Sequence, residues 1–191
     1  MKIKTLALFV MAVALGCPVG LGGRPVPVPS IGVAGQAKSG RPLPRIFDSA
    51  LPEVKAKSRI AVLLPTELPR PFREAKHALV EKAAANEYAI SLYCELGIGD
   101  AGFAAFFAAD ASHNYDPREL PGIHEVKLAR GVRGYFRPVS CGGSCAPAIL
   151  WWGQGGILYQ IQLKLPSTLD ENDQEKTITA VADSAILAGP R

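Results

Sequence analysis

The sequence is poor in the residues that most often carry enzyme chemistry. It contains three histidines and four cysteines in 191 residues. The histidines, His77, His113 and His124, show none of the spacings that are typical of metal ligands. We expect each of them to be a surface or hydrogen-bonded side chain. The sequence therefore predicts a protein that is not an enzyme and that carries no cofactor or metal.

The chain also lacks a strong excess of charge of either sign. Its 21 basic and 17 acidic residues give a formal net charge of +4, and no basic stripe stands out. Because nucleic-acid-binding domains usually concentrate lysine and arginine on one face, nucleic acid is not expected as a partner. The length suits one domain rather than two.

The N-terminus has the pattern of a secretory signal peptide. Two lysines precede an uncharged apolar run, residues 6–15, which is too short to span a bilayer stably. Residues 14–17 then resemble a bacterial lipobox, in which the cysteine thiol receives diacylglycerol. We predict a signal peptide over residues 1–22 with Cys17 lipidated; ordinary cleavage near residues 20–22 is the alternative. The protein is thus expected in the periplasm or cell envelope, anchored by lipid or otherwise secreted.

A proline- and glycine-rich stretch follows, residues 23–57. It shows no periodic apolar face, and its prolines remove backbone donors. We predict an extended linker that is dispensable for folding. Such a linker would suit a domain tethered to a membrane, and a disordered tail on a secreted domain is the alternative.

Residues 58–191 contain the apolar periodicity of a folded domain. Alternating apolar residues predict strands, and the clearest is residues 156–165, preceded by a glycine-rich hairpin turn. Trp151 and Trp152 are expected on opposite faces, one in the core and one partly exposed. Residues 73–85 fit a helix by propensity or a strand by their place before a turn, and residues 103–108 fit either a strand or a short buried helix. The other expected strands are residues 59–64, 88–96, 126–128, 132–137 and 149–152.

The last segment predicts a helix. Thr168 and Glu171 fit a capping box, and Gly189 with Pro190 fits a helix end. Together these patterns predict an α+β fold: a single domain with a largely antiparallel twisted sheet and a C-terminal helix packed on one face. The face of the helix that packs on the sheet is expected to comprise Ile178, Val181, Ala182, Ala185 and Ile186.

Two groups of segments resemble a known domain. Residues 59–69 form a strand followed by P-x-x-L-P, and residues 150–161 pair a tryptophan strand with a tyrosine strand before a final helix. This is similar to an uncharacterised extracytoplasmic domain of bacterial lipoproteins and of the C-termini of anti-sigma factors. The resemblance implies an α+β sheet without known catalysis. It also implies that residues 73–83 are a strand, which we adopt.

Cys141 and Cys145 flank a Gly-Gly-Ser loop between two predicted strands. A hairpin would place the two thiols opposite each other, and an oxidising compartment favours their linkage, so we predict a disulfide. A redox-active dithiol and a metal site at the same pair remain alternatives. A cysteine-protease nucleophile is excluded because no histidine follows Cys145. Cys94 lies on the apolar face of its strand and is expected to be a buried free thiol.

A basic set recurs along the middle strands and is interleaved with aromatic residues. It could line one sheet face and meet an anionic ligand, such as a lipid head group or polyanionic glycan; a solvated strand face is the alternative. The sequence therefore predicts an exported, membrane-tethered, non-enzymatic binding or sensor domain whose partner is a protein or an anionic ligand. The alternative is a periplasmic thiol-redox or metal-binding protein acting through the cysteine pair. The predicted ligand face comprises Lys127, Arg133, Tyr135 and Arg137.

Overall fold

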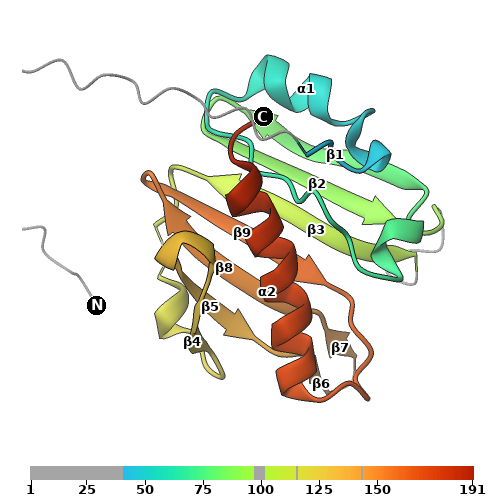
Figure 1. Cartoon of the computed structure of the whole chain (residues 1–191), viewed down its shortest axis with the longest axis vertical. Coiled ribbons are helices and arrows are strands. Elements are labelled where there is room, and N and C mark those ends of the chain that lie inside the picture. The colour runs from blue at the N-terminus through green and yellow to red at the C-terminus, as the bar shows by residue number, and fades with distance from the viewer. Residues whose placement is uncertain (1–40, 97–101, 115, 143) are drawn as a thin grey trace, which may run out of the picture. The chain divides into compact units, whose positions relative to one another are not determined.

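A computed structural model describes residues 41–96, 102–114, 116–142 and 144–191. The predicted signal peptide and Cys17 lie outside these residues. The described chain forms a seven-stranded sheet in the order β1-β2-β3-β9-β8-β5-β4 (Figure 1). The strands are β1 (His77–Ala84), β2 (Glu87–Tyr93), β3 (Phe103–Asp110), β4 (His124–Lys127), β5 (Arg133–Arg137), β8 (Ala148–Gln154) and β9 (Ile157–Leu163).

Every neighbouring pair in this sheet is antiparallel. The two segments with ambiguous patterns, residues 73–85 and 103–108, supply β1 and β3. Two glycines with positive φ, Gly155 and Gly156, form the tight turn between β8 and β9, as expected from the glycine run. A separate two-stranded ribbon consists of β6 (Ser140–Cys141) and β7 (Cys145–Ala146). The α+β prediction is confirmed.

The long helix α2 (Glu171–Ala188) packs across β8 and β9 (Figure 1). Its predicted apolar face is buried as expected, from Ile178 to Ile186. The predicted N-cap residue, Thr168, is wrong. The N-cap of α2 is Asp170, whose carboxylate accepts a hydrogen bond from the Asp173 N–H at 2.8 Å. A carboxylate also opposes the positive end of the helix, which favours aspartate here over threonine. Among the residues that the structure describes, no helix is long and apolar enough to cross a membrane.

The prediction of an extended linker is wrong for its second half, which is folded. Residues 45–57 form a 3₁₀ turn, η1 (Arg45–Phe47), and a short helix, α1 (Leu51–Lys57). Phe47 and Val54 are fully buried in the same core that α2 covers, and the Phe47 ring meets Phe107 edge-on at 5.5 Å. The prolines suggested an extended chain, but Pro52 occupies the first turn of α1, where it needs no N–H partner.

Residues 59–64 do not form the predicted strand, although residues 62–64 are buried. The segment lies over the core without joining the sheet. Tyrosine hydroxyls take the place of some of the backbone hydrogen bonds that a neighbouring strand would make. The Tyr88 hydroxyl accepts from the Leu63 N–H at 3.1 Å and donates to the Leu63 carbonyl at 3.0 Å. The Tyr159 hydroxyl donates to the Ala61 carbonyl at 3.0 Å. Apolar side chains alone could not distinguish this arrangement from a strand, because both bury them.

Burial has a direct electrostatic effect on these two tyrosines. Loss of water around the phenol disfavours the charged phenolate, so burial raises the pKa of Tyr159 to about 12. Burial raises the pKa of Tyr88 still further, with a smaller contribution from the charge on Tyr159. Both hydroxyls therefore stay protonated to a higher pH than a free phenol, and so remain able to donate to the backbone carbonyls of residues 61 and 63.

Candidate ligand-binding face

The sheet has two unlike faces. The 3₁₀ turn η1, α1, residues 60–68 and α2 contribute to one continuous core against one face. The opposite face carries the alternate side chains of each strand, and we call it the open face. Strand register places its residues in rows that run across the sheet. One row joins Lys82, Ala89, Ala108, Gln160 and Trp151 in directly paired positions.

The predicted ligand residues lie together on this open face, over β4 and β5. Lys127 is directly opposite Arg133, and both are exposed. Tyr135 and Arg137 follow Arg133 at two-residue intervals and are half-buried. Glu125, which is paired with Tyr135, places a carboxylate oxygen 3.8 Å from the Arg133 guanidinium. The four predicted residues thus lie close together on two paired strands. Their net charge stays positive when Glu125 is included.

The prediction that one of the two tryptophans is partly exposed is wrong: the exposed fraction is 3% for Trp151 and 2% for Trp152. Leu120 and Ile123, from the connection between β3 and β4, pack against Trp151 on the open face. The Arg137 guanidinium also lies 5.8 Å from the centre of the Trp151 ring, within cation–π range. This connection covers the β8 part of the open face.

The connection that covers Trp151 carries an ion pair of its own. Asp116 caps the 3₁₀ turn η4 (Pro117–Glu119), accepting from the Arg118 N–H at 3.0 Å and from the Arg118 guanidinium. Hydrogen bonds from the Arg118 side chain hold the pKa of Asp116 at about 2. The same contact raises the pKa of the Arg118 guanidinium. Asp116 therefore offsets the positive charge of Arg118, which does not add to the basic set.

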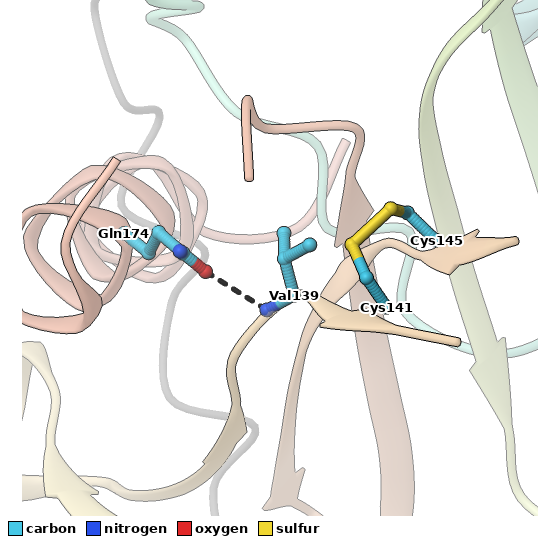
Figure 2. Close-up of a disulfide and its surroundings, with 4 residues drawn as sticks. All are labelled: Val139, Cys141, Cys145 and Gln174. Carbon is cyan, nitrogen blue, oxygen red and sulfur yellow. Dashed lines mark hydrogen bonds between the residues drawn. A yellow bond between two sulfur atoms is a disulfide. The ribbon is translucent and has the colours of Figure 1, made fainter. Parts of the chain in front are cut away.

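Cys141 and Cys145 form the predicted disulfide, with 2.05 Å between the sulfur atoms. The bond closes the β6–β7 ribbon (Figure 2). Both cysteines are exposed. Beside it, the Gln174 amide of α2 accepts from the Val139 N–H at 2.8 Å, and so joins this part of the chain to the helix (Figure 2). Cys94 is free but only half-buried, because β2 ends at Tyr93 and leaves it in a bend.

The three histidines lie in different parts of the fold. His77 is half-buried at the start of β1. His113 contacts the Asp110 carbonyl through Nδ1 at 3.1 Å. His124 lies between two carboxylates of α2, with Nε2 2.7 Å from Glu175 and Nδ1 3.6 Å from Glu171. Within the described part of the chain, no group of histidine, cysteine, aspartate and glutamate could hold a metal ion.

Sequence reasoning missed a cavity of about 230 Å³ on the open face. It lies where two small residues, Ala89 and Ala108, are paired on neighbouring strands. The only sequence signal was the run of phenylalanine and alanine over residues 103–108, which could not be assigned to a face without the register. No family model, curated protein or solved structure matches this chain.

Proposed function

We propose that this protein is an exported, membrane-tethered binding domain without catalytic activity, which binds an anionic ligand on the β4–β5 part of its open face. The observation that carries the proposal is the placement of Lys127, Arg133 and Arg137 on one face of two adjacent strands. The opposite face is taken up by the core, so the open face is the broad sheet surface that offers side chains to a partner. The pairing of Arg137 with the Trp151 ring orients this guanidinium over an apolar surface.

The charges of the neighbourhood support an anion. Glu125 offsets part of the positive charge of Arg133, and Asp116 offsets that of Arg118. Lys127 has no ion pair with a described residue, so its charge is available to a ligand. Because Lys127 and Arg133 are exposed, their attraction for an anion falls as salt screens it. Binding should therefore weaken steadily with ionic strength.

The test is charge reversal at the two exposed positions. Lys127→Glu/Arg133→Glu should lose binding to vesicles containing an anionic lipid and to a soluble polyanion such as dextran sulfate, while binding of neutral vesicles stays absent. Lys55→Glu/Lys176→Glu is the matched control, since it makes the same charge change on exposed residues of α1 and α2. Equal loss in both variants would show a net-charge effect and would refute a specific face.

The tether is tested separately through Cys17. If this thiol carries diacylglycerol, Cys17→Ser should move the protein from the membrane fraction to the soluble fraction of cells. Globomycin-sensitive processing in the parent, and its absence in the variant, would identify the lipoprotein pathway directly. A Cys17→Ser protein that fractionates with membranes as the parent does would contradict the lipid tether.

The exposure of both cysteines supports one alternative, a thiol-redox protein acting through Cys141 and Cys145. A thiol count on the unreduced mature protein, together with metal analysis, distinguishes the two functions. The binding proposal expects these cysteines to give no free thiol and the protein to contain no stoichiometric metal. Cys141→Ser/Cys145→Ser should leave function in cells unchanged; loss of function with unchanged stability would favour the redox alternative.

A further inference from the structure

The cavity on the open face is built by the strand register. In one row across the sheet, the paired alanines Ala89 and Ala108 lie between two long side chains, Lys82 and Gln160. Small side chains between larger ones leave a depression in the surface. Phe106 precedes Ala108 by two residues on the same face and lines the cavity on that side. The floor is therefore apolar and lies on the paired strands β2 and β3.

The opposite rim is polar and comes from the next row. Glu87 and Asp110 are directly paired, and both line the cavity. One Glu87 oxygen lies 2.7 Å from the Lys82 ammonium. One Asp110 oxygen accepts from the Ser112 N–H and hydroxyl, both at 2.7 Å. No residue that the structure describes is hydrogen-bonded to the second oxygen of either carboxylate, so this oxygen can accept a hydrogen bond from a ligand.

Two further groups add hydrogen-bonding capacity of both kinds. The Gln160 side chain is half-buried at the cavity, and its amide makes no hydrogen bond to any residue that the structure describes. An amide both donates and accepts. His113 uses Nδ1 toward the Asp110 carbonyl, which leaves Nε2 at the rim. The polar groups therefore converge on a small volume from β2, β3, β9 and the loop after β3.

These features define the ligand by chemistry. Lys82 balances Glu87 in charge, and Asp110 adds a further negative charge, so an anion would be repelled. A neutral group that both donates and accepts hydrogen bonds, such as a hydroxyl, suits the mixture of carboxylate, amide and imidazole. The volume, about 230 Å³, lies below the roughly 300–1,000 Å³ of cavities that hold drug-sized ligands. We propose that the cavity binds a single neutral pyranose ring, with its apolar face on Phe106 and the alanines and its hydroxyls toward Glu87, Asp110 and Gln160.

This site is separate from the anion-binding face proposed above. The cavity lies over β2, β3 and β9, whereas the basic set lies over β4 and β5. The two sites take ligands of different charge, so the proposals stand or fall independently. Binding of the pyranose should also be nearly insensitive to salt, since no net charge is neutralised.

The experiment is an NMR titration of the ¹⁵N-labelled folded chain with methyl glycosides of glucose, galactose, mannose and N-acetylglucosamine, each up to about 50 mM, a range that detects dissociation constants in the millimolar class. We expect saturable shifts for at least one glycoside, centred on residues 89, 108 and 160. Ala108→Leu fills the depression and should weaken that affinity by at least about tenfold, the change that 1.4 kcal/mol represents. Lys127→Glu/Arg133→Glu should leave it unchanged.

The titration has controls for the folding of the variant and for the chemistry of the ligand. Because Ala108 is partly exposed, the leucine variant is checked by its amide spectrum and melting temperature; Asp110→Asn, which keeps the size of the side chain, serves if it does not fold. Inorganic phosphate and cyclohexanol, titrated over the same range, report anionic and purely apolar recognition. No shift at the cavity with any of the four glycosides would overturn the proposal. A response to phosphate or cyclohexanol as large as that to the best glycoside would also overturn it. Unchanged glycoside binding in both Ala108→Leu and Asp110→Asn would do the same.

Discussion

Replacing Phe47 with alanine tests whether residues 45–57 belong to the fold. The side chain is fully buried and meets Phe107 edge-on. Truncating a buried phenylalanine costs about 3–5 kcal/mol, from lost transfer free energy and the cavity that remains. For a domain of about 150 residues, 1 kcal/mol shifts the melting temperature by roughly 2–4 °C. Phe47→Ala should therefore melt about 6–20 °C below the parent.

The measurement is thermal and urea unfolding followed by circular dichroism. Arg45→Ala is the matched control: it lies in the same 3₁₀ turn, its side chain is exposed, and it should change the unfolding free energy by less than about 0.5 kcal/mol. A protein that begins at Ser58 should lose more than Phe47→Ala, because it also lacks Val54. If Phe47→Ala melts within a degree of Arg45→Ala, the segment does not stabilise the core and the reasoning fails.

Three further outcomes are expected. Tyr88→Phe leaves both polar groups of Leu63 without their partner in the core, and should reduce the unfolding free energy by about 1–3 kcal/mol in urea titrations; no change would mean that the buried hydroxyl contributes nothing net. The Tyr159 phenol has a pKa of 10.0 in the unfolded chain and about 12 in the folded one. The stability that it contributes is therefore complete below pH 10.0 and is lost as the pH rises toward 12. An unfolding free energy that increases over this interval would contradict this direction. Reduction of Cys141–Cys145 should lower the melting temperature by only a few degrees, because a loop this short contributes about 2 kcal/mol by chain entropy; complete unfolding on reduction would refute a peripheral role for the ribbon.

The sheet was predictable where side-chain alternation is strong. In β9, Tyr159 and Ile161 face the core while Gln160 and Gln162 face the other way, and a period of two shows this directly. The end of α2 at Gly189 was equally clear, because the residue has a positive φ that glycine accepts without strain. These features depend on residues near each other in sequence, so local patterns suffice.

Features that depend on distant partners could not be predicted. Residues 59–64 have the composition of a strand, but their hydrogen-bond partners include the hydroxyls of Tyr88 and Tyr159, far along the chain. The burial of Trp151 depends on Leu120 and Ile123 in a loop with no periodic pattern. The basic residues of the ligand face could be assigned to one side by alternation within β5. The cavity could not, because it arises from pairing between strands.

The strand order has a consequence for the sequence of events in folding. β3 is an interior strand of the sheet, between β2 and β9, yet more than forty residues separate β3 from β9 along the chain. Until β9 is available, one edge of β3 has no partner, and this strand contains Phe103, Phe106 and Phe107. An apolar unpaired edge is a template for association with other chains. A chain interrupted before residue 157 should therefore aggregate through β3, and the last hairpin and α2 complete the sheet and remove this edge together.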